Sequence, residues 1–224
     1  MTITGGHTEV TNAVTRPVLV GNMLGFVPAR RLISTAGARA GDVLLMAGAA
    51  GIEGSAILAY DRARQIEKTL GRAALRAAQR LAITPGTSVL RAGLIAAGAG
   101  AHAMHDPTEG GVGAAIHEMA YAAGLRVTVD LDRIAVLAIT RDICRIMGID
   151  PLGLTSSGAL LIAVRSGRAA RLMNALARAH IDAAAIGKFE TGSGVRAVRG
   201  GKPARLPWFK RDEILRVAGE EPHL

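Results

Sequence analysis

The chain has 224 residues, half of them hydrophobic, which excludes a disordered chain and allows one domain, or one domain with an arm, around a full core. Its 27 basic and 18 acidic residues give a formal net charge of +9, which raises the question of nucleic-acid binding. The arginines are scattered, however, and only three Phe, two Tyr and one Trp are available for base stacking. A basic surface facing solvent is therefore favoured over nucleic-acid binding, and a small anionic ligand is the next candidate.

The only cysteine, Cys144, excludes an internal disulfide bond and a cysteine-rich zinc site. Its neighbours Ile143, Ile146 and Met147 recur at helical spacing before Gly148, which predicts a buried cysteine rather than a nucleophile. No apolar run reaches about 18 residues, so no membrane span is predicted. The first residues lack a basic segment followed by an apolar one, so no secretory signal is predicted and the expected location is the cytoplasm.

The first third of the chain predicts an extended segment over residues 17–27, a buried strand over 43–46 and one long helix over 55–81. A glycine-rich turn, residues 47–54, joins the strand to the helix. Strand, glycine turn and helix also build nucleotide loops, but a Walker lysine and a dinucleotide motif are both absent. Close backbone packing and a ligand-facing loop therefore stay open as alternatives for this turn.

Residues 84–86, Thr-Pro-Gly, break the chain before a small-residue helix predicted over 88–97. A helix after residue 111 has its apolar positions on one face and His117 opposite, which predicts a solvated His117. Residues 125–131 alternate between apolar and polar types, as a strand with one exposed face does.

The last third predicts a strand, a helix, a strand and a hairpin-like strand, over residues 159–164, 167–180, 183–189 and 195–198. The tail, residues 206–214, is expected to pack back on the domain. This order predicts an α+β fold in which a mixed β-sheet is flanked by helices in α/β/α layers, partly ferredoxin-like.

The segment His105-Asp106-Pro107-Thr108-Glu109-Gly110-Gly111 combines the residues of a helix start with a glycine pair. Asp106 suits the N-cap, Pro107 the first helical position, and Glu109 the third position of a capping box. The cap does not account for two glycines, each costing about 1 kcal/mol against alanine in a helix. Open N–H groups at a helix N-terminus bind anions, so a turn close to a phosphate is favoured over a plain cap.

This segment and the helix after it closely resemble the Asp-Pro-Thr-x-Gly-Gly segment of the aminoimidazole ribonucleotide synthase superfamily, with the hydrogenase-maturation carbamoyl dehydratases as the nearest branch. Three further segments match in the expected order: Gly5-Gly6-His7-Thr8-Glu9-Val10, Gly41-Asp42-Val43-Leu44-Leu45 running into Gly51-Ile52-Glu53-Gly54, and Gly148-Ile149-Asp150-Pro151-Leu152-Gly153-Leu154 before Ser157-Gly158-Ala159-Leu160-Leu161-Ile162. The expected fold is that of the C-terminal domain of these proteins.

The resemblance implies a protein of two halves, in which the amino-terminal half carries most of the acidic residues that hold magnesium and ATP. The chain opens directly before the Gly-Gly-His-Thr motif, so we expect residues 1–27 to be a remnant of that half and an interface arm. Residues 28–216 are then the C-terminal domain and residues 217–224 a tail. An edge strand in the arm would recruit another chain, so the expected partner is a second copy or a separate protein that supplies the amino-terminal half.

ATP and magnesium are the cofactors that the resemblance implies. Asp106 is the expected metal- or substrate-facing carboxylate, Thr108 a hydroxyl donor, and His105 a group that orients an anion. The residues expected to border the nucleotide or its phosphates are Gly5, Gly6, His7, Glu9, Gly110 and Gly111. Glu109 stands where the hydrogenase-maturation branch commonly has arginine, and this reversed charge indicates a different substrate or only a capping role.

Two classes of function follow. In the first, the chain is the C-terminal domain of an ATP-dependent maturation or synthase-type enzyme that needs an amino-terminal half in trans. In the second, it is a non-catalytic binding or scaffold domain that has kept the fold without ATP chemistry. A separate polypeptide carrying the acidic half would favour the first.

Overall fold

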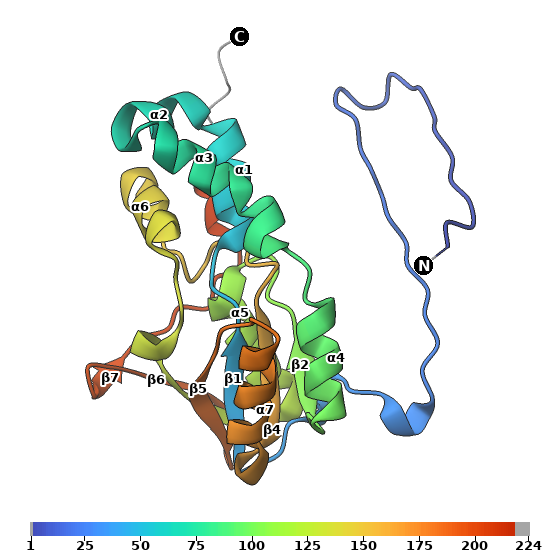
Figure 1. Ribbon diagram of the computed structural model, residues 1–224, viewed down its shortest axis with the longest axis vertical. Helices are drawn as coiled ribbons and strands as arrows, with labels where there is room; N and C mark the ends of the chain where they lie inside the picture. Colours follow the sequence, from blue (N-terminus) through green and yellow to red (C-terminus); the bar gives the residue numbers. More distant parts are fainter. Residues whose placement is uncertain (1, 218–224) are drawn as a thin grey trace. The chain divides into compact units, whose positions relative to one another are not determined.

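The computed structural model describes residues 2–217, and the chain divides into two compact units at residues 32 and 33 (Figure 1). Residues 2–32 are called the arm here, and residues 33–217 the domain. The arm has no strand among its described residues, and its one helical turn is Ala29–Arg31. Its large apolar side chains are exposed, among them Val18, Leu19, Val20, Met23, Leu24 and Phe26.

The domain is built on a seven-stranded sheet of order β2-β4-β1-β5-β3-β6-β7 (Figure 1). The strands are β1 Asp42–Ala47, β2 Ala103–His105, β3 Arg126–Asp130, β4 Leu160–Arg165, β5 Ala183–Glu190, β6 Gly194–Arg199 and β7 Lys202–Ala204. All neighbouring pairs are antiparallel except β3 and β6, which run parallel. The predicted mixed sheet is therefore confirmed.

Helices cover both faces of this sheet. They are α4 Leu90–Gly98, α5 Gly111–Ala123 and α7 Ser166–Arg178. On β1, Leu44 and Met46 pack in the cluster that contains α5, while Leu45 packs in the cluster that contains α4 and α7. This alternation is what a strand buried on both faces produces, and it confirms the α/β/α layers.

Four further helices form a third hydrophobic cluster beside the sheet: α1 Ile52–Asp61, α2 Ala63–Leu70, α3 Arg72–Arg80 and α6 Ala138–Met147. The prediction of one helix over residues 55–81 is wrong, because the backbone leaves the helical region at Arg62 and Gly71. Gly71 takes φ 87°, where glycine is favoured, and the turn brings Leu75 of α3 back to Leu58 of α1. The apolar spacing continues across both breaks, so periodicity did not reveal them.

Cys144 of α6 lies in this cluster and is 2% exposed, as predicted. Burial raises the pKa of its thiol to about 12, with smaller contributions from the charges of Asp150 and Glu213. A thiol held neutral in this way is a small core residue and a poor nucleophile.

Among the described residues, Arg72–Gly98 has the length and apolar composition of a membrane-crossing helix. It is divided between α3 and α4, because Thr84 takes the non-helical angles φ −138° and ψ 112°. It also carries Arg76, Arg80 and Arg91. We therefore read it as two helices of the domain.

The glycine-rich turn 47–54 is packed closely against neighbouring backbone. A Cβ on Gly48 would lie 2.4 Å from the carbonyl oxygen of Gly158. The N–H of Gly51 donates to Ser156 Oγ at 2.8 Å, and that of Gly54 to the carbonyl of Thr155 at 3.1 Å. Of the two readings left open, backbone packing is the one that the geometry matches.

Candidate functional site

The Asp-Pro-Thr turn, residues 105–111, joins β2 to α5. The predicted N-cap at Asp106 is wrong, because α5 begins at Gly111 with Gly110 as its N-cap. Pairing of His105 with Leu161 keeps the backbone extended up to the turn, so a helix cannot begin at residue 106. Asp106, Thr108 and Glu109 are all exposed, and the capping box does not form.

The glycine pair is required by close approach of other backbone segments. Gly110 and Gly111 take φ 77° and 62°, in the left-handed region. A Cβ on Gly110 would lie 2.6 Å from the carbonyl oxygen of Phe209, and one on Gly111 would lie 2.6 Å from that of Leu152. The two glycines therefore let the tail and the loop 148–154 pack directly on the start of α5.

A carboxylate of the tail occupies the anion position at the N-terminus of α5. The N–H of Gly110 donates to Asp212 Oδ2 at 2.8 Å, and the N–H of Ile214 donates to Asp212 Oδ1 at 2.9 Å. Asp212 is 4% exposed. The N–H of Gly111 donates to the carbonyl of Thr108 at 3.0 Å. A negative group at this position is stabilised by the helix dipole and N–H donors, as a phosphate would be.

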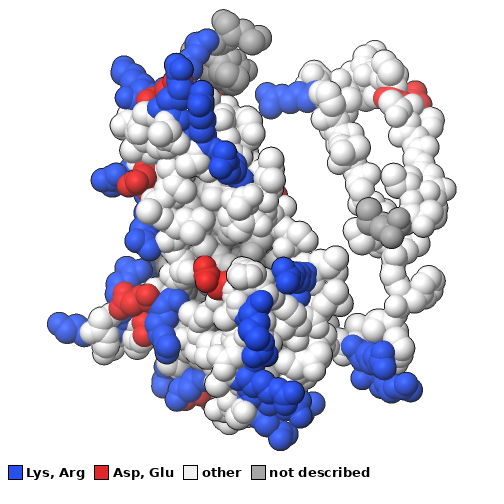
Figure 2. All heavy atoms as spheres, viewed as in Figure 1, with Lys and Arg blue, Asp and Glu red and all other residues white. Residues whose placement is uncertain are grey.

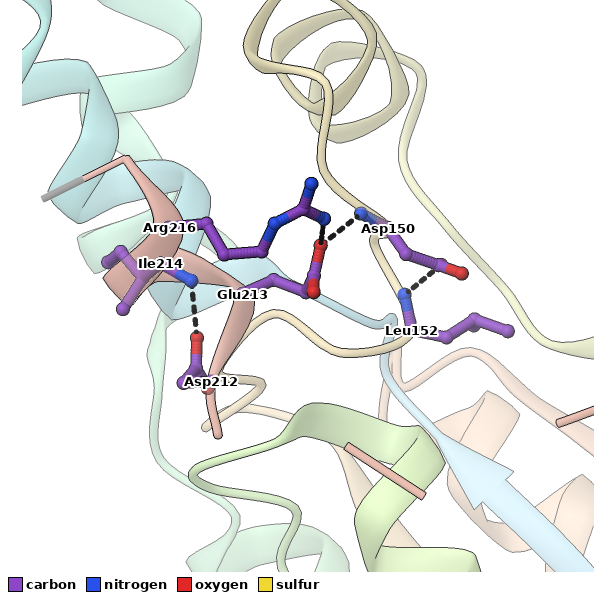
Figure 3. A network of polar contacts seen from close by, with 6 residues as sticks. All are labelled: Asp150, Leu152, Asp212, Glu213, Ile214 and Arg216. Atoms are coloured by element: carbon purple, nitrogen blue, oxygen red, sulfur yellow. Dashed lines mark hydrogen bonds and ion pairs between the residues drawn. The ribbon is translucent and has the colours of Figure 1, made fainter. Parts of the chain in front are cut away.

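Figure 3 shows how the tail is held on the loop 148–154. Glu213 Oε2 accepts the N–H of Asp150 at 3.0 Å and a guanidinium N–H of Arg216 at 2.6 Å. Asp150 Oδ1 in turn accepts the N–H of Leu152 at 2.9 Å. The prediction that the tail packs back on the domain is thus confirmed. Of the predicted end segment 217–224, all but Val217 lies outside the described residues.

His105 lies between a hydroxyl and a carboxylate. Its Nε2 is 2.7 Å from Glu118 Oε2, and its Nδ1 is 3.2 Å from Thr35 Oγ1. When Nε2 carries the proton and donates to Glu118, Nδ1 is free to accept the proton of the Thr35 hydroxyl, for which the carbonyl oxygen of Met104 at 3.3 Å is the other acceptor. A base oriented by a carboxylate and facing a hydroxyl is the arrangement that proton transfer needs. Sequence reasoning missed Thr35 and Glu118, which come from a separate 3-10 turn, Thr35–Gly37, and from α5.

Asp106 has no complete set of metal ligands around it. Within residues 2–217, no group of three or more His, Cys, Asp or Glu side chains is placed to hold a metal ion. Magnesium prefers oxygen ligands in octahedral geometry and is usually held by one or two carboxylates, waters and substrate phosphates. The described part of the chain therefore does not fit a metal site built by its own side chains.

The four predicted residues in the arm are all exposed. His7 Nε2 lies 3.1 Å from Glu9 Oε2, and this pair faces solvent. Gly5 and Gly6 have open space where a side chain would begin. Nothing inside the arm requires glycine at these two positions.

His117 is not solvated as predicted. Its ring stacks on Trp208, with ring centroids 5.3 Å apart and planes 3° apart, and its Nε2 is 3.1 Å from the carbonyl oxygen of Leu206. The tail therefore covers His117 on the polar face of α5, while Glu118 and Tyr121 on that face are exposed as predicted.

A buried contact between a carboxylate and a histidine joins the two strands that flank β4. Asp42 of β1 is 3% exposed, and its Oδ2 lies 2.9 Å from Nδ1 of His102, next to β2. The same oxygen accepts the N–H of Arg39 at 2.8 Å. Both of its oxygens lie within hydrogen-bond distance of a group of the fold, so this buried carboxylate is used to hold structure.

Basic side chains are spread over the face of the domain drawn in Figure 2 and are mixed with acidic ones. They do not form a single stripe there. A stripe or a groove is the usual footprint of nucleic-acid binding.

Comparison with known proteins shows the family to which the domain belongs. Residues 39–199 match the family model of the AIR synthase related protein, C-terminal domain. A carbamoyl dehydratase HypE from Cupriavidus necator is 34% identical over 157 residues, which are 68% of this chain and 41% of that protein. The chain thus spans about two fifths of the length of this relative.

Solved structures agree on the fold. The crystal structure of E. coli HypE superposes with a TM-score of 0.64 at 25% identity, covering 83% of this chain and 55% of that one. A hydrogenase maturation protein HypE in complex with ATP superposes at 0.62 and 22% identity, over 84% and 57%. The structure of a HypE–HypF complex superposes with a TM-score of 0.61 at 21% identity, covering 78% of this chain and 56% of that one. In that structure HypE is bound to a partner protein.

Proposed function

The chain belongs to the AIR synthase related family through its C-terminal domain, and from this we propose that it is the C-terminal domain of an ATP-dependent maturation or synthase-type protein, similar to the hydrogenase maturation factors. The proposal rests on the Asp-Pro-Thr turn, the segment in which this chain closely resembles those proteins. The turn presents Asp106 and Thr108 to solvent, next to a histidine that is already hydrogen-bonded at both ring nitrogens.

We assign three roles within the turn. His105 is the proton acceptor, with Glu118 orienting its ring and Thr35 as the hydroxyl that it faces. Asp106 and Thr108 face the substrate as carboxylate and hydroxyl. The glycines at 110 and 111 support the turn by packing, and a phosphate contact there would require the carboxylate of Asp212 to leave.

The ATP chemistry is proposed to need an amino-terminal half in trans. Residues 2–217 do not hold three acidic or histidine ligands together, so carboxylates from elsewhere would have to bind the metal that accompanies ATP. The exposed apolar side chains of the arm are a candidate contact for that protein or for a second copy of this chain. We place this assembly in the cytoplasm.

Calorimetry tests the proposal. ATP with magnesium is titrated into the chain alone, and then into the chain mixed with the amino-terminal half of the related HypE. We expect saturable ATP binding only in the mixture, with Asp106→Asn weakening it and leaving the fold unchanged. Magnesium-dependent binding by the chain alone in the low micromolar range, about −8 kcal/mol, would show that the site is complete without the second half.

A non-catalytic scaffold domain is the second candidate, and the position of Asp212 favours it. A carboxylate of the same chain fills the anion position at α5, where it accepts the N–H groups of Gly110 and Ile214. The two candidates differ in the mixture experiment. A scaffold binds the amino-terminal half, and the complex does not bind ATP.

A further inference from the structure

A surface groove lies on the domain outside the Asp-Pro-Thr turn. Its volume is ≈ 650 Å³, within the size range of small-molecule sites. It is lined by residues between 131 and 152, and by Arg199 and Arg216 from later in the chain. Residues 148–152 belong to a motif that the proposed function leaves without a role.

The apolar walls of the groove are preformed. Leu131, Ile134 and Leu152 belong to the cluster between α5 and the sheet, and each is 6% exposed. Ile149 is anchored in the helical cluster on the other side. Because these side chains are fixed by the core, a ligand with an apolar body would meet a rigid surface and would cause little ordering cost.

Three guanidinium groups come to the groove from α6, the end of β6 and the 3-10 turn Glu213–Arg216. Arg141 is fixed by one hydrogen bond, from Nη2 to the carbonyl oxygen of Val136 at 2.7 Å. Arg216 is fixed by its contact with Glu213 (Figure 3). Arg199 has no acidic side chain within ion-pair distance in residues 2–217. Each guanidinium has five N–H donors, so most of the donors remain available.

The two carboxylates of the lining already accept backbone hydrogen bonds. Asp132 Oδ2 accepts the N–H of Gly200 at 2.5 Å, and Asp150 Oδ1 accepts the N–H of Leu152 at 2.9 Å. Both bonds hold the walls of the groove in place. Neither Arg141 nor Arg199 has a carboxylate partner among residues 2–217, so their charged N–H donors remain to bind an anion.

We propose that this groove binds a small organic anion, with a carboxylate or phosphate group held by Arg199 and Arg141 and an apolar body resting on Ile134 and Pro151. The site is complete within the domain. It works without the amino-terminal half and without ATP, so its success or failure is independent of the proposed function.

The experiment is calorimetric titration of the chain with phenyl phosphate at low salt, with inorganic phosphate and benzoate as comparators. We expect saturable 1:1 binding of phenyl phosphate and weaker binding of inorganic phosphate, because the latter lacks the apolar body. Benzoate tells whether a carboxylate serves as well as a phosphate. We expect Arg199→Ala to weaken phenyl phosphate binding about tenfold, as loss of a charge-assisted hydrogen bond does.

Arg178→Ala is the matched control, because this exposed arginine of α7 lies outside the groove and its loss changes the net charge equally. Circular dichroism of both variants checks that the fold is kept. The proposal is overturned by absence of saturable phenyl phosphate binding, by equal weakening in Arg199→Ala and Arg178→Ala, or by equal affinity for phenyl and inorganic phosphate.

Discussion

Asp212→Ala should detach the tail from the start of α5. The buried carboxylate accepts the N–H groups of Gly110 and Ile214 at 2.8 and 2.9 Å. Loss of an N-cap carboxylate costs about 0.5–2 kcal/mol, and a buried donor left without a partner costs about 1–3 kcal/mol. We therefore expect the free energy of unfolding to fall by about 2–4 kcal/mol.

Asp212→Asn separates charge from hydrogen bonding. Its amide keeps one acceptor oxygen, but its NH₂ group must face the second backbone N–H. We expect about half the loss seen for alanine, because hydrogen bonds to charged groups are worth about 1.5–3 kcal/mol and neutral ones about 1 kcal/mol. Urea unfolding, followed by circular dichroism and by Trp208 fluorescence, measures both variants.

Asp106→Ala is the matched control for these variants. Asp106 is exposed and does not cap α5, so its replacement should stay within about 0.5 kcal/mol of wild type. If Asp106→Ala costs as much as Asp212→Ala, or if Asp212→Ala unfolds at the wild-type urea concentration, the assignment of the cap to Asp212 is refuted.

Three further predictions concern the glycine pair, the cysteine and the arm. Gly111→Ala should destabilise the domain by about 2–4 kcal/mol in urea unfolding, because a Cβ there meets two carbonyl oxygens at 2.6 Å and φ is 62°, whereas Gly5→Ala, in open space, should not change it. Because the pKa of Cys144 is raised to about 12, its thiol stays neutral at pH 8, and native protein should react with Ellman's reagent far more slowly than unfolded protein; equal rates would contradict its burial. Deletion of residues 2–27 should turn a dimer into a monomer in light scattering, and a full chain that is already monomeric would remove the arm as a self-association contact.

Local pattern was enough to predict most regular elements of this protein. The buried run before the glycine turn is β1, the alternation over residues 125–131 is β3, and the amphipathic spacing after residue 166 is α7. These elements can be told apart because side chains alternate between two faces in a strand and repeat every 3.6 residues in a helix. The four ordered motifs are also enough to identify the family.

Tertiary structure alone decided which groups meet at the Asp-Pro-Thr turn. Its sequence reads as a complete cap, yet the acceptor for Gly110 is Asp212, 102 residues later in the chain. The partners of His105 are likewise 70 residues before it and 13 after it. A helix cap can be judged from sequence only when the acceptor is local, because any buried acceptor brought there by folding satisfies the same N–H group. The glycine pair pointed to a close approach at this turn, and only the packing of the tail and the loop 148–154 showed that the approaching groups belong to the protein itself.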